Sequence, residues 1–365
     1  GRYVTPEERE SILRGREDDE MGKRGLVRYK DRWVTPEEKS ALERGLVKHE
    51  GRWMTPDEKK KAQGFVRYKG EWIHEDDLER LKDLDRVRAV GKGKLEAIDT
   101  PHFRVFTVYP EAQTRKVAEA CERVYDQFFR VFDLAEGEKV FHRAKCRVFL
   151  FRKAIYFDRF MDWFGPEMEL EPARVNLIRQ NRGTYYIYPE PYIAGYQFPD
   201  PFEQLMGRTV HKVGHIMIHG WKYDGEWMPW WITEGLGAYW EIAVLGRCDT
   251  YFITIRDYGN MGDSMAEKWR DSEDWKVKLK SIVGSRRDPS LVDIRTKTLN
   301  EIGHVELAKS WSVVDWLIAR HRKEFIEFIL LMKKGEKQDD AAKKAFGKNW
   351  REMDKEWREY VSANY

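Results

Sequence analysis

Three side chains in the middle of the chain have the types and the spacing of a metal site. His211 and His215 lie four residues apart in the segment HKVGH, and Glu234 follows after 18 further residues in WWITEGLGAYWE. On a helix, two histidines at this spacing share one face and can bind one ion. A glutamate from a second helix would leave one tetrahedral position of a zinc ion open. The pattern therefore predicts a zinc site, and Gly235 and Gly237 would let the two helices approach closely.

The spacing and the segment WITEGLGAY resemble the gluzincin zinc metallopeptidases, in which HExxH is followed by a glutamate roughly 18 residues later. The resemblance is greatest to the bacterial peptidase-MA-like branch and covers residues 98–365. It implies an α+β fold in which a small mixed sheet and the zinc-type helices precede a helical C-terminal subdomain. It also implies zinc as the cofactor and peptide hydrolysis as the activity of an intact site.

The residue after the first histidine is Lys212, where the resemblance implies the glutamate that acts as general base. A protonated lysine has no lone pair with which to accept a proton. At ~5 Å and an effective dielectric constant of ~20, its charge would repel a divalent ion by roughly 6–7 kcal/mol. Structural zinc sites are worth about 10–16 kcal/mol, so the affinity for zinc should fall without vanishing. We expect a degenerate catalytic site, and the sequence leaves open whether zinc is retained.

Two further positions depart from the pattern that the resemblance implies. An acid that orients a histidine ligand is expected four residues after the glutamate, where this chain has Ala238. A tyrosine or histidine that stabilises the oxyanion is expected near Leu307, with His304 and Tyr239 as nearby alternatives. Together with Lys212, these departures indicate that the catalytic apparatus has decayed.

Lys212 itself has three interpretations. It is tolerated at an inactive site, or its ammonium group replaces the metal and pairs with Glu234, or it serves as a base or nucleophile in another reaction. The third interpretation needs a lowered pKa, for which the neighbouring sequence offers no cause. His219, one turn after His215, is either a substitute ligand or a cation at the helix end.

Tyrosines cluster in TYYIYPEPYIAGY, residues 184–196. The resemblance implies that an extended peptide binds by strand addition at this edge of the sheet, so peptide binding can outlast catalysis. We therefore predict a substrate cleft here, with aromatic packing beneath a loop as the alternative. The predicted cleft residues are Tyr185, Tyr186, Tyr188 and Tyr239.

The elements that must position these residues follow an α/β pattern from residue 98 onward. Alternating apolar residues predict strands, and apolar residues at helical spacing predict helices. The predicted strands are 102–110, 145–151 and 183–189, and the predicted helices are 111–134, 153–165, 201–219, 311–335 and 339–365. We assign residues 98–248 to an α/β domain that carries HKVGH and WITEG, and residues 249–365 to a helical subdomain.

Residues 1–90 contain tandem repeats in which Trp33, Trp53 and Trp72 recur every 19 to 20 residues. Each copy predicts two short strands joined by a turn, then a helix that starts with a threonine cap and a proline. So small a unit cannot bury its tryptophan alone, and neighbouring units must help to cover it. We predict an accessory or spacer module, or a protein-interaction module. The expected turns are Lys30-Asp31, Glu50-Gly51 and Lys69-Gly70, and the expected caps are Thr35 and Thr55.

Composition narrows the class of protein. The 66 basic and 63 acidic residues nearly balance, so nothing indicates a nucleic-acid partner. No apolar run approaches the ~18 residues that span a membrane. Cys121, Cys146 and Cys248 form no CxxC pair, so neither a cysteine metal site nor a disulfide framework is expected. The compartment stays open, with a secreted or periplasmic location favoured because a segment before Gly1 can have been removed.

These observations give three hypotheses for function. We expect a pseudopeptidase, a gluzincin-like domain with degenerate catalytic residues that acts as a binding or structural subunit for a protein or peptide partner. One alternative is an active zinc peptidase whose proton acceptor is Glu226 or Glu241. Another is a purely structural component of a larger assembly, attached through the repeats.

Overall fold

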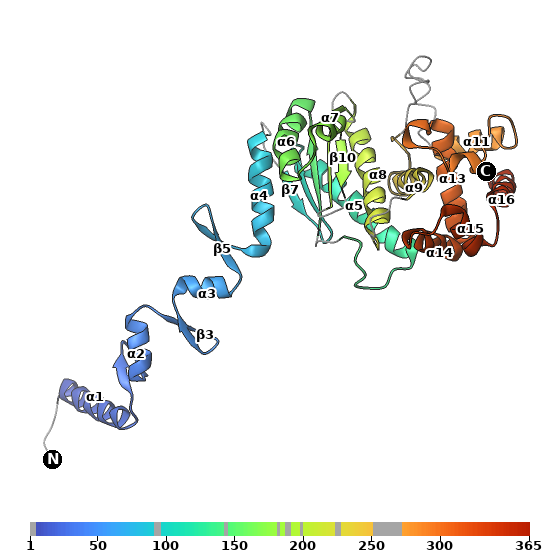
Figure 1. Cartoon of the computed structure of the whole chain (residues 1–365). Helices are drawn as coiled ribbons and strands as arrows, with labels where there is room; N and C mark the ends of the chain where they lie inside the picture. The colour runs from blue at the N-terminus through green and yellow to red at the C-terminus, as the bar shows by residue number, and fades with distance from the viewer. Residues whose placement is uncertain are drawn as a thin grey trace. The chain divides into compact units, whose positions relative to one another are not determined.

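The computed structural model describes residues 5–90, 96–141, 145–180, 183–186, 191–197, 200–222, 228–250 and 272–365. The chain divides into two compact units, Gly1–Asp83 and Leu84–Tyr365. The first holds the repeats, and the second holds an α/β part and the C-terminal helices (Figure 1). Helix α4 (Glu75–Val90) contains the division between the units, and the predicted boundary at residue 248 falls inside the second unit.

The first unit alternates short helices with three β-hairpins, each a separate two-stranded sheet. Glu50 and Gly51 both have positive φ (48° and 81°), as do Lys69 and Gly70 (49° and 90°), which is typical of tight hairpin turns. Threonine caps α1, α2 and α3 through a capping box with the glutamate three residues on. The two turns and the caps Thr35 and Thr55 are those that the sequence predicts, and Thr5 is a further cap of the same kind. The elements are α1 (Pro6–Lys23), β1 (Val27–Tyr29), β2 (Arg32–Val34), α2 (Pro36–Glu43), β3 (Val47–His49), β4 (Arg52–Met54), α3 (Pro56–Ala62), β5 (Phe65–Tyr68) and β6 (Glu71–His74).

Charged side chains cover the tryptophan of each repeat. A basic residue on the paired strand lies over each indole and also forms an ion pair with an acid of the preceding helix. Val34 and Ala41 are the buried apolar side chains in the described part of this unit, so there is little apolar core. Neighbouring elements do help to cover each tryptophan, as expected, but through these ion pairs. The three sets are Asp18–Arg28–Trp33, Glu38–Lys48–Trp53 and Asp57–Arg67–Trp72.

The second unit is built on a five-stranded mixed sheet with the order β10-β11-β9-β8-β7. The three central strands are parallel, and the two outer strands are antiparallel to their neighbours. The sequence predicted strands at the positions of β8, β9 and β10 but not β7 or β11. The strands are β7 (Glu96–Asp99), β8 (Phe103–Thr107), β9 (Cys146–Phe151), β10 (Gly183–Tyr186) and β11 (Tyr192–Tyr196).

Helices cover both faces of this sheet (Figure 1). Helices α5 (Glu111–Phe132) and α8 (Phe202–Gly220) lie on one face, where Val148 and Leu150 of β9 join their core. Helix α6 (Ala154–Glu167) covers the other face, where Phe149 and Phe151 contact Phe160. Helix α7 (Pro172–Gln180) packs against α6 and β10. The alternation along β9 thus fixes α8 beside the sheet.

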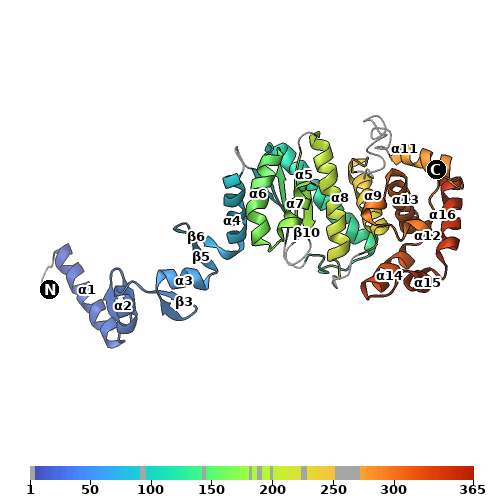
Figure 2. The same ribbon diagram turned by 45° about the horizontal axis from the view of Figure 1, so that its top comes forward.

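The C-terminal part is helical. Helix α9 (Trp230–Leu245) packs against α8 on one side and α13 (His304–Arg320) on the other (Figure 2). The helices predicted at 311–335 and 339–365 are each interrupted, because the chain leaves the helical conformation at His321 (φ −135°) and at Gly347 (φ 67°). The other helices are α11 (Ser272–Ile282), α12 (Leu291–Ile294), η2 (Leu299–Glu301), α14 (Arg322–Lys333), α15 (Gln338–Phe346) and α16 (Trp350–Asn364).

Helices and a small mixed sheet together give the α+β class that the sequence predicts. Within the described part of the chain, no helix combines the length and the apolar character needed to cross a membrane.

Candidate metal centre

Helices α8 and α9 carry the predicted ligands where the two helices pack together. Glycine makes this approach possible. A Cβ atom on Gly237 would lie 2.5 Å from His211 Nε2, and a Cβ atom on Gly235 would lie 2.7 Å from the carbonyl oxygen of Ser310 on α13. Gly237 therefore lets an imidazole rest on the α9 backbone, and Gly235 lets α13 approach from the other side. The predicted role of both glycines in close helix packing is confirmed.

His211, His215 and Glu234 converge in the interior, where they are 2%, 4% and 1% exposed. Glu234 Oε2 lies 2.9 Å from His211 Nε2 and 3.6 Å from His215 Nε2. Ligand atoms ~2.1 Å from a tetrahedral zinc ion lie about 3.4 Å from one another, and the two distances bracket this value. The three residues could therefore hold one metal ion with little movement.

His215 has no hydrogen-bond partner in the described part of the chain, although both of its ring nitrogens are buried. Leaving a buried polar group unsatisfied costs roughly 1–3 kcal/mol. Burial, reinforced by the nearby His211, lowers the pKa of His215 well below its usual value. The ring is therefore neutral, which is the form of histidine that binds metals. An ion beside Glu234 would supply the partner that His215 lacks.

His211 lies between two carboxylates. Its Nε2 atom contacts Glu234, and its Nδ1 atom lies 3.2 Å from Oε2 of Glu241. Burial alone would lower the pKa of His211, but these two contacts outweigh it and raise the pKa to about 9. Burial also raises the pKa of Glu234, against the effect of His211, so the pair shares one proton. A metal ion would displace that proton.

Lys212 extends toward the edge of the sheet. Its Nζ atom lies 2.7 Å from the place that a Cβ atom on Gly183, at the start of β10, would occupy. No ion pair joins it to Glu234, which contacts the two histidines, so the ammonium group does not take the metal's place. Burial, with a smaller effect of Arg208, lowers the pKa of this half-buried lysine to about 7. The neighbouring sequence gave no reason to expect that shift.

Glu241 supplies the acid that was expected at Ala238. It lies seven residues after Glu234, which is two turns further along the same face of α9, and it is fully buried. This spacing of seven residues is the signal in the sequence that could have identified Glu241 as a neighbour of the first histidine. Glu241 lies on the Nδ1 side of His211, behind the ligand group, so it does not fit the role of alternative proton acceptor. Glu226, the other candidate for that role, lies outside the described residues.

A second group of possible ligands consists of His211, Glu241 and Cys248. The Cys248 thiol already donates to Oε2 of Glu241 over 3.3 Å and to the carbonyl oxygen of Thr250 over 3.1 Å. Burial raises its pKa well above the usual value, so the thiol stays protonated. Because thiols bind metals as thiolates, this group is a weaker candidate than the one around His215. The sequence did not predict a cysteine so close to the site.

The predicted tyrosine cleft is only partly assembled. Tyr185 of β10 lies beside the ligands, with its ring centroid 5.1 Å from that of His215 in an edge-on arrangement. Burial, with a contribution from Glu234, raises the pKa of its hydroxyl. The side chain of Tyr186 and the whole of Tyr188 lie outside the described residues. Tyr239, which was also predicted to line the cleft, lines a cavity of about 230 Å³ whose other lining residues are Ile242, Ala243, Lys276, Trp311 and Asp315.

Three other sequence candidates do not join the ligands. His219 is buried with Nε2 3.3 Å from the Thr233 hydroxyl, and it belongs to neither group of possible ligands among the described residues. Leu307 is a fully buried core residue of α13, and His304 begins that helix. The phenol nearest to the expected role is that of Tyr185, which approaches from the sheet.

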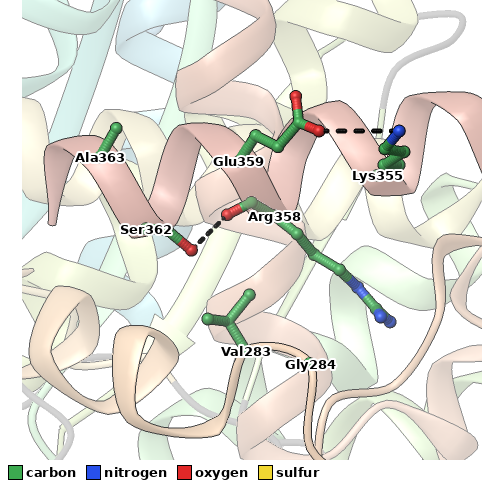
Figure 3. A pocket seen from close by; sticks show the side chains of 7 residues that line it. All are labelled: Val283, Gly284, Lys355, Arg358, Glu359, Ser362 and Ala363. Atoms are coloured by element: carbon green, nitrogen blue, oxygen red, sulfur yellow. Dashed lines mark hydrogen bonds and ion pairs between the residues drawn. The ribbon is translucent and has the colours of Figure 1, made fainter.

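A larger surface cavity, of about 510 Å³, lies beside α16 (Figure 3). Its charged side chains already have partners: Lys355 pairs with Glu359, and Arg358 pairs with Asp288 and Asp354. The cavity therefore offers no unpaired group around which a binding site would form. Its lining residues are Val283, Gly284, Lys355, Arg358, Glu359, Ser362 and Ala363.

Comparison with known proteins does not assign this site. No protein-family model matches the sequence, and no curated protein matches it either. Conclusions about function therefore depend on the site itself.

Proposed function

We propose that the second unit is a gluzincin-like domain that binds zinc through His211, His215 and Glu234 but has lost peptide hydrolysis, which makes it a pseudopeptidase. One observation carries this proposal. Three buried ligands converge around a histidine that has no other described partner, beside a lysine at the place of the proton acceptor.

The donor set favours zinc over other common ions. Two imidazole nitrogens and one carboxylate oxygen suit zinc, whereas magnesium and calcium prefer sets made of oxygen alone. The protonation states support this choice, because His215 is neutral and Glu234 shares a proton that a cation can displace. When bound, zinc would act as a Lewis acid at its open position.

Hydrolysis would need a proton acceptor on the open side of the metal. Lys212 occupies that place in the sequence, but its amine lies against Gly183 on β10. Glu241 lies behind His211 and already accepts hydrogen bonds from several donors. Neither Lys212 nor Glu241 therefore combines the chemistry of a general base with a position on the open side of the metal.

Without hydrolysis, the function proposed for this unit is to bind a protein or peptide partner. The edge of the sheet at β10 is suited to such binding. Among the described strands, β10 pairs with β11 alone and ends the sheet. Tyr185 of β10 lies beside His215, and the Lys212 amine lies at the start of the same strand. We infer that an extended peptide segment of a protein partner adds to this edge by backbone hydrogen bonds.

Elemental analysis and a cleavage assay test the proposal together. After dialysis against zinc and then buffer, the protein should hold about one zinc per chain, and His215→Ala should hold much less. Neither protein should cleave casein or a fluorogenic peptide library. Chelator-sensitive cleavage by the natural sequence would establish an active peptidase, and the absence of zinc would favour a purely structural protein.

A further inference from the structure

The cavity that Tyr239 lines has an unpaired acid in its wall. Asp315 of α13 contributes this carboxylate, and no hydrogen bond or ion pair satisfies it within the described part of the chain. We propose that the cavity binds a small organic cation that donates hydrogen bonds, namely a primary ammonium or a guanidinium group. The proposal is independent of the zinc site, because Tyr239 lies five residues after Glu234 and therefore roughly 140° around α9 from that ligand.

Three helices build the cavity. Helices α9 and α11 both pack against α13 (Figure 2). On α9, Tyr239, Ile242 and Ala243 have the spacing of residues that share one helical face. On α13, Trp311 and Asp315 lie four residues apart and also share a face. The cavity therefore lies where these two faces meet, with α11 beside them.

Asp315 lies among apolar and aromatic side chains. Trp311 is buried and lines the inner part of the cavity, whereas Ala243 is exposed at its open side. The Asp315 side chain is half-buried between them. Burial raises its pKa, and the charge of Lys276 lowers the pKa only in part. A partly desolvated carboxylate without a partner is unfavourable, and a bound cation would remove that cost.

The lining favours a cation with N–H groups over other ligands. The Asp315 carboxylate offers two oxygen atoms that accept hydrogen bonds, and the nearby hydroxyl of Tyr239 can accept another. Ammonium and guanidinium groups donate strong hydrogen bonds to carboxylates, and aromatic rings such as those of Tyr239 and Trp311 attract them further. An anion would be repelled by Asp315, and an apolar ligand would leave the carboxylate unsatisfied.

Lys276 of α11 weakens the site without filling it. Its charge acts on Asp315, but no ion pair joins the two residues in the described part of the chain. The Nζ atom lies instead 5.9 Å from the centre of the Tyr365 ring. A second cation beside Asp315 would be repelled by this ammonium group, so removing the charge of Lys276 should strengthen binding.

The size of the cavity limits the ligand to a small group. Its volume of about 230 Å³ is below the ~300–1,000 Å³ of pockets that enclose drug-sized ligands. Two sources supply the required chemistry: a free small amine or guanidine, and the side chain of a lysine or arginine on a protein partner.

The experiment titrates the full-length protein with methylguanidinium and propylammonium and follows binding by saturation-transfer NMR. Tetramethylammonium is the control ligand, since it is a cation without N–H groups. We expect both N–H donors to bind in the millimolar range and tetramethylammonium to bind at least about tenfold more weakly.

Three variants identify the residues responsible. Asp315→Asn keeps the shape of the side chain but removes its charge, and it should weaken binding of methylguanidinium by at least about tenfold. Lys276→Gln should strengthen it by about threefold. Asp340→Asn, at an exposed acid of α15, is the matched control and should leave it unchanged.

A blocked arginine, N-acetylarginine methylamide, distinguishes the two sources. Binding as tight as that of methylguanidinium would support a side chain from a protein partner, and binding of the small cations alone would support a free amine or guanidine. Equal affinity of methylguanidinium for the natural sequence and for folded Asp315→Asn would overturn the proposal. Equal binding of tetramethylammonium, or no saturable binding of either donor in the millimolar range, would also overturn it.

Discussion

Lys212 follows the first ligand directly, yet its amine is directed at Gly183 of the edge strand. The geometry of His211, His215 and Glu234 is compatible with a metal ion. We propose that this site lacks a proton acceptor, because Lys212 follows the first ligand and its amine lies against Gly183. From the sequence, the charge of Lys212 was expected to weaken zinc binding. The structure reduces that expectation, because burial lowers the pKa of Lys212 to about 7, so the amine carries less positive charge near neutral pH than an ordinary lysine.

Two substitutions at Lys212 test separately how its positive charge affects zinc binding and how the missing proton acceptor affects cleavage. Lys212→Gln removes the positive charge, and zinc should bind about tenfold more tightly, which corresponds to about 1.4 kcal/mol. Lys212→Glu adds an acceptor as well, so chelator-sensitive cleavage of a peptide library should appear only in this variant. Equal cleavage by both variants, or no change in zinc affinity in either, would contradict this account.

His219 predicts how stability depends on pH. Burial, with a smaller effect of Lys333, lowers its pKa to about 3, and its Nε2 atom lies by the Thr233 hydroxyl. The unfolded chain binds a proton near pH 6.5 while the folded chain does not, so stability is lost as pH falls below 6.5. Between pH 7 and pH 5, this group should reduce the free energy of unfolding by about 2 kcal/mol.

Urea unfolding at the two pH values measures this effect. His219→Gln should lose about that share of the pH dependence. His321→Gln, which changes a half-buried histidine at the end of α13, is the control. If both variants keep the full pH dependence of the natural sequence, His219 is not the group responsible.

The sequence predicted the three ligands but not the residue behind them. The HxxxH spacing follows from helix geometry, and the position of Glu234 follows from the spacing that the family resemblance implies, so both can be read from the sequence. Glu241 becomes part of the site only because Gly246 turns the chain and brings the N–H groups of Asp249 and Thr250 to its carboxylate. That loop depends on tertiary contacts, which local patterns do not encode.

At the scale of elements, α13 and α16 are joined by a buried ionic cluster. Lys309 of α13 is fully buried, with Nζ 2.7 Å from Asp288 and 2.8 Å from Asp354. The same Nζ atom lies 3.9 Å from the centre of the Trp357 ring. Arg358 approaches both aspartates from the surface. The cluster thus docks the last helix on α13, which itself packs against α9.

Removing the central lysine should loosen this docking. Lys309→Met leaves two buried carboxylates with one basic partner, and we expect a loss of about 3 kcal/mol in the free energy of unfolding. Urea unfolding followed by tryptophan fluorescence measures it, with Lys355→Met, at an exposed ion pair, as control. A loss below about 1 kcal/mol would mean that the cluster contributes little to stability.

Helices and strands whose apolar residues recur at a regular spacing could be predicted from the sequence. Those that depend on the elements packed around them could not. Helices α5 and α8 and strand β8 have a clear period. Strand β9, which is buried at every position, was recognisable as a run rich in β-branched and aromatic residues, CRVFLF. Strand β11 was missed because its sequence, YIAGY, contains alanine and glycine, and because a central strand buried on both faces shows no alternation. The break at His321 was missed because the apolar pattern continues across it.

At the scale of the whole chain, the repeats and the metal group belong to different compact units. Every residue of the proposed site lies within Leu84–Tyr365. Deletion of residues 1–83 should therefore leave the zinc stoichiometry unchanged and the zinc dissociation constant within about twofold. Elemental analysis and chelator competition on the shortened chain check this expectation. Loss of zinc from a folded shortened chain would show that the repeats contribute to the site.

The central claim is that His211, His215 and Glu234 hold zinc although the proton acceptor is gone. Crystals of the zinc-loaded protein, measured at the zinc absorption edge, test it most directly. We expect one strong anomalous peak about 2.0–2.2 Å from an atom of each of these three residues. A peak at His211, Glu241 and Cys248 instead, or no peak near either group, would contradict it.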